Sequence, residues 1–318
     1  MKDPHFLRSQ YSDRTLDERK RWYSSVAEAY NRVRPRYAEA WIDRVVAIAQ
    51  LLPNTRLLEV GCGPGTATVS FAKRGYSMVC LEPSQGAYQL ALENCKTYPR
   101  VSVVNTTFEE WELAADQFDA VLAATSFHWV TPDVGYAKAA AALRDRGALI
   151  LLWNTGMMPT DKINQVLEPV FQAYAPELAK YETHEQQLES LKTIGQALLD
   201  SNLFQDLILD HVLYETVYSV DDYLALLSTY SSYIALEIEQ RDRLFEAMRY
   251  TLKEVFGGAI ALSYRSVFQV MRRVCQIDCV KGKNSSWKAI AKLNGETVEG
   301  RFPIGNRHRP LLGNILNR

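Results

Sequence analysis

Short apolar runs and longer amphipathic stretches alternate along the first half of the chain. Each run has the length of a buried strand and is bounded by glycine, proline or polar residues. The predicted strands are 56–60, 77–81, 101–104, 118–124 and 148–153, and the predicted helices between them are 66–74, 85–94 and 134–143. Strands that alternate with helices predict an α/β fold with a mostly parallel sheet.

The second half of the chain has a different pattern. Helical periodicity dominates, and only two segments alternate apolar and polar residues well enough for strands. The predicted helices are 161–173, 184–200, 223–229 and 237–255, and the predicted strands are 207–218 and 262–270. The helices between the last strands predict a lid beside the sheet.

An acidic residue and three alternating glycines follow the first predicted strand. Glycine lets the chain bend sharply and lets a ligand approach bare backbone, so this turn predicts a nucleotide or adenosyl site at the mouth of the sheet. Its spacing is G-x-G-x-G rather than the dinucleotide pattern G-x-G-x-x-G. The candidate ligand-binding residues are Glu59, Gly61, Cys62, Gly63, Gly65 and Thr66.

A second carboxylate, Glu82, ends the second predicted strand and is followed by Pro83 and Ser84. A carboxylate at the tip of this strand can accept hydrogen bonds from both ribose hydroxyls of a nucleoside. Pro83 cannot continue the strand, and Ser84 is a favourable N-cap for the next helix. We therefore count all three as candidate cofactor-binding residues.

The glycine block resembles motif I of class I S-adenosylmethionine-dependent methyltransferases. Two further segments, Tyr30–Tyr37 and the run A-x-x-x-F-H-W-V at 123–130, resemble the type 11 methyltransferases, in particular the trans-aconitate methyltransferase-like subset. The resemblance implies a doubly wound, mostly parallel seven-stranded sheet with an antiparallel last strand and a helical lid. It also implies S-adenosylmethionine as the cofactor.

The same resemblance assigns roles to residues outside the glycine block. In the family, the loop after the third strand holds the adenine, and a segment near the N-terminus lies across the cofactor. In this chain, Arg34 matches the N-terminal segment and would meet the methionine carboxylate. Thr107, Phe108 and Glu109 lie in the loop after the third strand. Thr125, at the end of the fourth strand, is a further cofactor-binding candidate.

His128 and Trp129 follow the fourth strand, where parallel α/β enzymes place their chemistry. We expect both to contact the methyl acceptor. His128 could act as a general base, because an ordinary histidine titrates near neutral pH, or it could form part of the pocket wall. Both interpretations stay open at this stage.

Composition excludes several function classes. The net charge is −1, so no global attraction to nucleic acid or anionic membrane is expected. The five cysteines lack zinc-site spacing and fit a reduced, cytoplasmic protein, and the histidines are scattered, so no metal site is predicted. No apolar segment is long enough to target or span a membrane. A monomer and a dimer are both compatible with the sequence.

The chain is predicted to have five parts. These are a polar segment at 1–21, helices at 22–52 that cover the cofactor site, the binding core at 53–153, the lid with the last two strands at 154–273, and a basic tail at 274–318. The tail has eight Lys or Arg against three acidic residues, and it is the one feature that leaves nucleic-acid binding open.

The predicted function is methyl transfer from S-adenosylmethionine to a small molecule, with a carboxylate or hydroxyl oxygen as acceptor. Two alternatives remain. A non-catalytic protein that binds S-adenosylmethionine would keep the glycine turn without an acceptor pocket. A nicotinamide-dependent reductase would use a similar turn, but the third dinucleotide glycine and a Tyr-x-x-x-Lys pair are missing.

Overall fold

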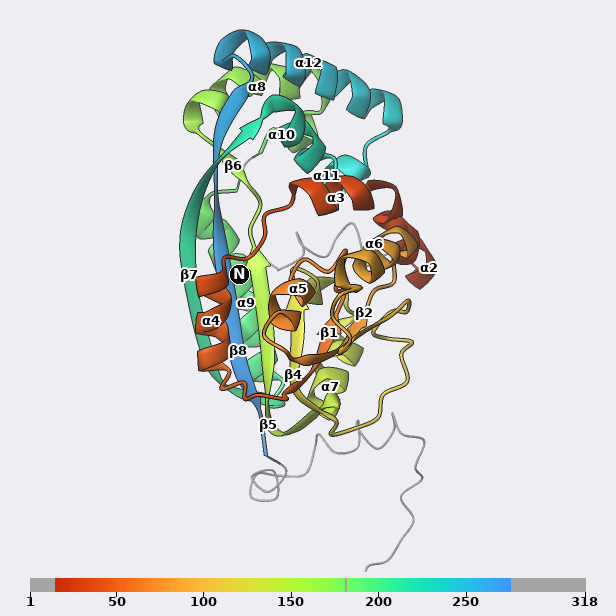
Figure 1. The fold of residues 1–318 in the computed structure, drawn as a ribbon. Helices are drawn as coiled ribbons and strands as arrows, with labels where there is room; N and C mark the ends of the chain where they lie inside the picture. Colours follow the sequence, from red (N-terminus) through yellow and green to blue (C-terminus); the bar gives the residue numbers. More distant parts are fainter. Residues whose placement is uncertain (1–14, 181, 276–318) are drawn as a thin grey trace, which may run out of the picture.

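A single twisted sheet runs through the structure, which is a computed structural model that describes residues 15–180 and 182–275 (Figure 1). Its parallel strands are β1 (Arg56–Val60), β2 (Ser77–Leu81), β3 (Val101–Val104), β4 (Phe118–Ala124) and β5 (Leu143–Asn154). A long antiparallel strand, β8 (Ala259–Arg273), pairs with β5 on one side and with β7 (Phe204–Ser219) on the other. The two-residue strand β6 (Met158–Pro159) also pairs with β8, beyond the end of β5.

Within the described residues, the long strands have the order β3-β2-β1-β4-β5-β8-β7, and only β8 is antiparallel to its neighbours. The predicted seven-stranded, mostly parallel sheet is therefore confirmed. The strand order reverses between β1 and β4, and ligands of open α/β sheets bind at such a reversal, outside the carboxyl ends of the strands.

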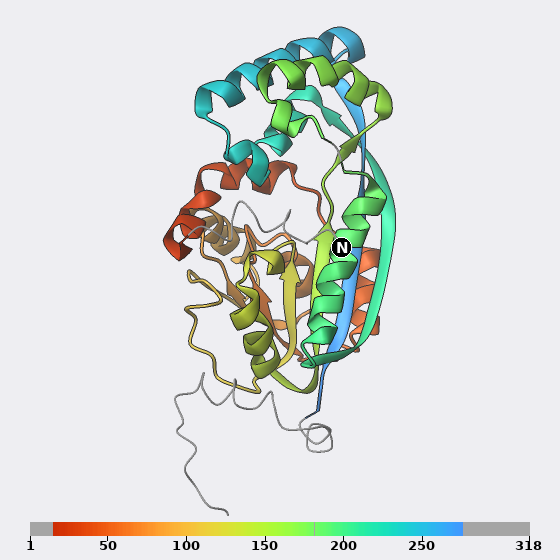
Figure 2. The same ribbon diagram turned by 180° about the vertical axis from the view of Figure 1, so that it is seen from behind.

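Helices cover both faces of the sheet. Successive side chains of a strand point to opposite faces, so the apolar strands present buried side chains on both. Leu57 faces one apolar cluster, with α4 (Glu39–Ile48), α5 (Thr68–Ala72) and α6 (Gln85–Cys95). Leu58 faces the opposite cluster, with α7 (Pro132–Ala142) and α9 (His184–Asp200). Figures 1 and 2 show α4 and α9 on opposite sides of the β7–β8 pair.

A separate lobe of four helices lies above the sheet in Figure 1; we call it the helical lobe. It consists of α8 (Asp161–Tyr174), α10 (Val220–Leu227), α11 (Ser231–Ile234) and α12 (Ile238–Phe256). These helices form a third apolar cluster with the upper end of β8, from Ile260 to Tyr264. The predicted lid is thus a lobe with its own core.

Two short helices, α2 (Leu16–Trp22) and α3 (Ala27–Val33), lie between the helical lobe and the sheet; we call them the cover helices (Figure 1). Helix α3 ends at Val33, as Pro35 predicts. The next helix, α4, begins at Glu39, so residues 34–38 separate the two helices.

Two local predictions were wrong. Helix α5 starts at Thr68 and ends at Ala72, and is therefore shorter at both ends than the predicted 66–74, because the glycine turn continues to Ala67. Strand β5 begins at Leu143 rather than at the predicted residue 148, and a register shift between Phe118 and Ala120 of β4 accommodates the earlier start. Sequence periodicity does not show such an irregularity.

The described part of the chain contains no helix that is both long and apolar enough to cross a membrane. Most of the predicted polar segment at 1–21 and of the basic tail at 274–318 falls outside the described residues, which include only 15–21 and 274–275 of these two segments.

Candidate cofactor and acceptor site

A cavity of about 550 Å³ opens at the carboxyl ends of β1, β2, β4 and β5, beneath the cover helices and the helical lobe. This volume is in the range of small-molecule sites. Most of the predicted site residues line it: Arg34, Gly61, Cys62, Gly63, Thr66, Glu82, Pro83, Ser84, Thr107, Phe108, Glu109, Thr125, His128 and Trp129. Glu59 and Gly65 do not belong to the lining.

The glycine turn forms one wall of the cavity. Gly61 has a φ of +66°, and a Cβ there would lie 2.8 Å from the Cβ of Ser126, so the site has no room for a side chain. Gly63 has a φ of +57°, and a Cβ there would meet nothing within 4 Å. Because Gly63 lines the cavity, that open space is room in which a ligand can touch the backbone.

Glu82 connects the glycine turn to the next helix. Its carboxylate accepts hydrogen bonds from the backbone N–H of Gly63 at 2.7 Å and from that of Ser84 at 2.8 Å. Burial raises the pKa of Glu82 to about 7, against the two backbone hydrogen bonds, which lower it. Each carboxylate oxygen keeps a lone pair for a further donor, such as a ribose hydroxyl.

Glu59 lies under the turn. Its carboxylate accepts from the hydroxyl of Thr68 at 2.6 Å, and burial raises its pKa to about 8. The second oxygen, Oε1, is buried without a hydrogen-bond partner among the described residues. Gly65 faces α6, because a Cβ there would lie 3.3 Å from the sulfur of Cys95. These two residues support the turn from behind.

The loop after β3 closes on itself. The hydroxyl of Thr107 donates to Glu110 at 2.9 Å and accepts from the Glu110 backbone N–H at 3.1 Å. Phe108 is buried in the core cluster below β4, and the Glu109 carboxylate accepts from the N–H of Thr131 at 3.0 Å. The loop is thus held at the edge of the cavity by its own side chains.

His128 lies in a short 3-10 helix, Phe127–Trp129, at the end of β4. Its ring packs against those of Trp129 and Trp153, with centroids 4.2 and 5.5 Å away. Burial lowers the pKa of His128 to about 3, so the ring is neutral near pH 7. Its Nδ1 is buried without a hydrogen-bond partner in the described structure.

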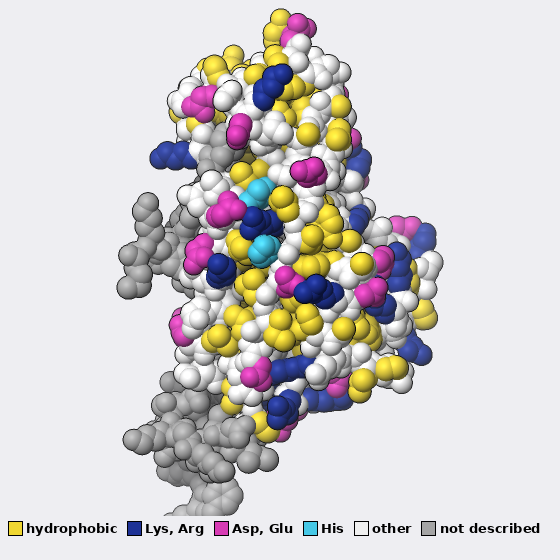
Figure 3. Space-filling view, turned by 90° about the vertical axis from the view of Figure 1, so that its left-hand side faces the viewer, with side chains coloured by type: hydrophobic (Ala, Val, Ile, Leu, Met, Phe, Trp, Pro, Cys, Tyr) yellow, Lys and Arg dark blue, Asp and Glu magenta, His cyan; other side chains and the backbone are white. Residues whose placement is uncertain are grey.

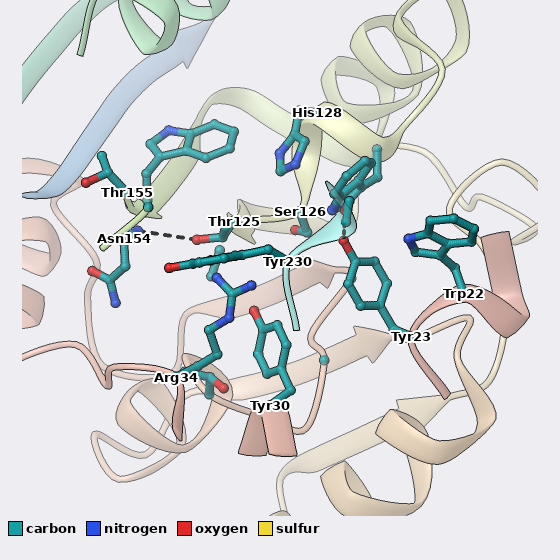
Figure 4. A pocket seen from close by; sticks show the side chains of 18 of the residues that line it. Trp22, Tyr23, Tyr30, Arg34, Thr125, Ser126, His128, Asn154, Thr155 and Tyr230 are labelled. Carbon is teal, nitrogen blue, oxygen red and sulfur yellow. Dashed lines mark hydrogen bonds between the residues drawn. The ribbon is translucent and has the colours of Figure 1, made fainter. Parts of the chain in front are cut away.

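Arg34 joins the cover helices to the helical lobe. Its guanidinium donates to the hydroxyl and to the carbonyl of Thr229, at 2.8 and 2.9 Å. It also lies over the rings of Tyr30 and Tyr230, 4.9 and 4.2 Å from their centroids (Figure 4). Arg34 forms no ion pair within residues 15–180 and 182–275, so its charge stays available to an anion in the cavity.

Across the cavity from the glycine turn lie further side chains, of which Trp22, Tyr23 and Tyr37 were not predicted from the sequence. Trp22 and Tyr23 of the cover helices line the cavity, and the Tyr23 hydroxyl lies 2.7 Å from that of Ser231 in the lobe (Figure 4). Tyr230 accepts from the backbone N–H of Met157 at 3.0 Å. The backbone of Thr125 has a φ of +55°, and its hydroxyl lies 3.2 Å from the hydroxyl of Tyr37, within hydrogen-bonding distance. Nothing in the sequence indicates the positive φ of Thr125.

The sequence comparisons agree with this geometry. Residues 57–147 match the methyltransferase domain family. This segment, which runs from β1 into β5, is similar to a methyltransferase domain. The open backbone at Gly63 and the carboxylate of Glu82 together form a surface suited to the ribose of a nucleoside.

An uncharacterised methyltransferase of Mycobacterium tuberculosis is 32% identical over 133 residues, which are 42% of this chain and 52% of that protein. Magnesium-protoporphyrin O-methyltransferase of Rhodobacter capsulatus is 27% identical over 145 residues, 44% of this chain and 65% of that protein. The chain thus spans about half to two thirds of the length of these relatives.

A solved structure of a putative type II methyltransferase from Anaeromyxobacter dehalogenans has the same fold. It superimposes with a TM-score of 0.55 at 18% identity, over 76% of this chain and 99% of that one. This match covers more of the chain than residues 57–147, and at this identity it shows a shared fold.

Proposed function

We propose that the protein transfers the methyl group of S-adenosylmethionine to an oxygen of a small molecule, with a carboxylate as the preferred acceptor. The observation that carries this proposal is the combination in one cavity of the glycine turn and Glu82 with Arg34 and a neutral His128. When bound, the cofactor supplies an electrophilic methyl group on a sulfonium.

The chain's own part is to position the acceptor and to exclude water. Trp22, Tyr23 and Trp129 bring apolar surface to the cavity from the cover helices and from the end of β4. Arg34 supplies a cation between two tyrosine rings, suited to a planar carboxylate. A carboxylate acceptor is already ionised, so no side chain has to remove a proton.

His128 supports a carboxylate over a hydroxyl. A general base works best when its pKa lies near the working pH, and burial holds the pKa of His128 far below that. The neutral ring therefore serves as a wall and as a hydrogen-bonding group. The resemblance of 30–37 and 123–130 to the trans-aconitate methyltransferase-like subset points to the same acceptor class.

Two alternatives have less support. A non-catalytic protein that binds S-adenosylmethionine needs no acceptor chamber, yet aromatic residues of the cover helices and the lobe line one here. A nicotinamide-dependent reductase would need the dinucleotide spacing that the turn lacks.

The first experiment is a thermal-shift comparison of S-adenosylhomocysteine with NADPH, followed by transfer of labelled methyl groups to a panel of small carboxylates and alcohols. We expect stabilisation by S-adenosylhomocysteine alone and methyl-ester products from one class of carboxylate. Stabilisation without transfer to any acceptor would favour the binding protein, and stabilisation by NADPH alone would favour the reductase.

The anion that Arg34 binds can be identified by Arg34→Ala. If Arg34 meets the methionine carboxylate, the variant should lose the preference for S-adenosylhomocysteine over methylthioadenosine, which lacks that carboxylate. If it meets the acceptor, this preference should persist while KM for the acceptor rises about 10- to 100-fold. Arg32→Ala is the matched control, because exposed Arg32 pairs with Asp222 outside the cavity lining.

A further inference from the structure

The outermost strand of the sheet, β7, has an open edge. Within residues 15–180 and 182–275, β7 pairs with β8 and with no other strand, and it is sixteen residues long. Figure 1 shows it at the rim of the sheet, with nothing drawn in colour beyond it along the hydrogen-bonding direction. A long edge strand presents unpaired N–H and C=O groups and is a template for another strand.

The direction of these groups can be inferred from His211. Its backbone N–H bonds to the side chain of Asp210 at 2.8 Å, so it does not take part in the ladder with β8 and faces the open edge. Backbone groups alternate along a strand, and the register with β8 is regular from Ile208 to Ser219. The N–H groups of Leu213, Glu215 and Val217 therefore face outward as well.

The side chains of these outward residues form an exposed stripe that alternates in character. His211 and Glu215 are polar and exposed, whereas Leu213 and Val217 are apolar with 48% and 70% of their surface exposed. Figure 3 looks onto this edge and shows apolar side chains among charges of both signs, with no extended field of one sign. The surface therefore does not fit a strongly charged partner such as nucleic acid.

The stripe is complementary to itself. In an antiparallel pair of two β7 strands with the two-fold axis at Leu213, Leu213 faces its own copy and each His211 faces Glu215 of the other chain. Leu209 then faces Val217, so every apolar residue meets an apolar one. With the axis moved to Glu215, two carboxylates would face each other, and with the axis at Tyr214, Leu213 would face Glu215. Directly opposed like charges destabilise a sheet, so the axis at Leu213 is favoured.

We propose that a second copy of this chain pairs with β7 through this stripe, so that the two sheets join edge to edge in a symmetric dimer. The hydrogen-bonding requirement is met by the same register, because His211, Leu213 and Glu215 all have outward N–H and C=O groups. Pairing replaces the bond from His211 N–H to Asp210 with a bond to the carbonyl of the partner's Glu215. The contact is isologous, so it closes at two copies.

The proposal is tested by sedimentation velocity of the full chain over about a hundredfold range of concentration, because a dimer of this kind depends on concentration. We expect wild type to dimerise. Leu213→Lys places two ammonium groups at the two-fold axis and should raise the dissociation constant at least about tenfold. Val255→Lys is the matched control, because Val255 on α12 is also 48% exposed and lies outside the stripe.

A charge exchange tests the register itself. His211→Glu alone opposes two carboxylates at each end of the stripe and should also raise the dissociation constant at least about tenfold. Adding Glu215→Lys to that variant restores opposite charges and should restore the dimer. Circular dichroism and melting temperatures check that each variant is folded.

A wild type that stays monomeric over the whole range would overturn the proposal. So would a dimer that neither Leu213→Lys nor His211→Glu weakens more than Val255→Lys does, because the contact would then lie on another surface. Failure of the double variant to recover would contradict the axis at Leu213.

Discussion

The proposed cofactor side of the cavity and its proposed acceptor side are built from different kinds of structure. The cofactor side consists of backbone and one carboxylate, from two neighbouring strand ends at 60–66 and 82–84. The acceptor side consists of side chains from the cover helices, the end of β4 and the helical lobe. The cofactor side directly continues the hydrogen-bonded strands of the sheet. The acceptor side depends on three segments whose hydrogen bonds to one another all involve at least one side chain.

The contacts between these segments show how the acceptor side is held together. Arg34 bonds to Thr229, Tyr23 to Ser231, and the Tyr218 hydroxyl to the carbonyl of Val33 at 2.6 Å. All of these contacts join the cover helices to the helical lobe or to its supporting strand. The comparison teaches that a ligand can be recognised by local motifs on one side of a site and by long-range packing on the other.

The largest expected effect concerns Glu82. Glu82→Ala removes the acceptor of two backbone N–H groups and the proposed partner of the ribose hydroxyls, and should weaken binding of S-adenosylhomocysteine by about 2–4 kcal/mol. Isothermal titration calorimetry measures this loss, with exposed Glu93→Ala as the control. Equal affinities of wild type and Glu82→Ala would remove Glu82 from the site.

The next effect separates backbone strain from lost ligand space. Gly63 and Gly257 both have a positive φ, +57° and +70°, and a Cβ at either would meet nothing within 4 Å. Gly63→Ala and Gly257→Ala should therefore lose a similar amount of stability, about 1–2 kcal/mol. Only Gly63→Ala should also weaken S-adenosylhomocysteine, by about tenfold or more, because its methyl group enters the cavity. Equal affinities of the two variants would mean that the ligand does not approach Gly63.

A smaller effect is expected on the acceptor side at His128. Because its pKa is lowered to about 3, His128 should contribute no step to the pH profile of turnover between about pH 5 and 9. His128→Gln should keep most of the activity and leave cofactor affinity unchanged. A profile that rises through about pH 6.5 and disappears in His128→Gln would instead make His128 the base and favour a hydroxyl acceptor.

The last effect is on stability as a function of pH. Burial raises the pKa of Glu59 from 4.5 to about 8, so the folded protein holds a proton that the unfolded chain releases above about pH 4.5. The stabilisation of the folded state by this retained proton is fully present below about pH 4.5 and is lost as the pH rises toward 8. Glu59→Gln should therefore have a melting temperature that falls less than that of wild type between about pH 5 and 8. Parallel curves for the two proteins would show that Glu59 does not titrate in this window.

Much of the cofactor side could be predicted from the sequence, because its determinants are local. An apolar run, a glycine turn and the acid at the end of the next strand lie within one βαβ unit, whose connection is nearly always right-handed. The bounds of β1, β2, β3 and β4 agree with the predicted strands. The cavity then follows from the reversal of strand order at β1 and β4.

The acceptor side could be predicted only in part. Helices α8, α10 and α12 of the lobe could be predicted from their periodicity, but α11 could not. Periodicity also does not determine which face of a helix packs against which segment. Tyr23 and Ser231 are far apart in the chain and carry no shared pattern. The low pKa of His128 is also a tertiary effect, because it depends on burial against Trp129 and Trp153.

The sequence by itself determined the alternation of strands and helices, the mostly parallel sheet and the residues of the glycine turn, because periodicity and glycine conformation act over a few residues. Only the tertiary structure decided that Glu59 lies beneath the turn, that Arg34 lies between two tyrosine rings, and that no strand of residues 15–180 and 182–275 pairs with the outer edge of β7. Those features depend on the packing of distant segments, in which burial and hydrogen bonding select one arrangement among many that the local pattern allows.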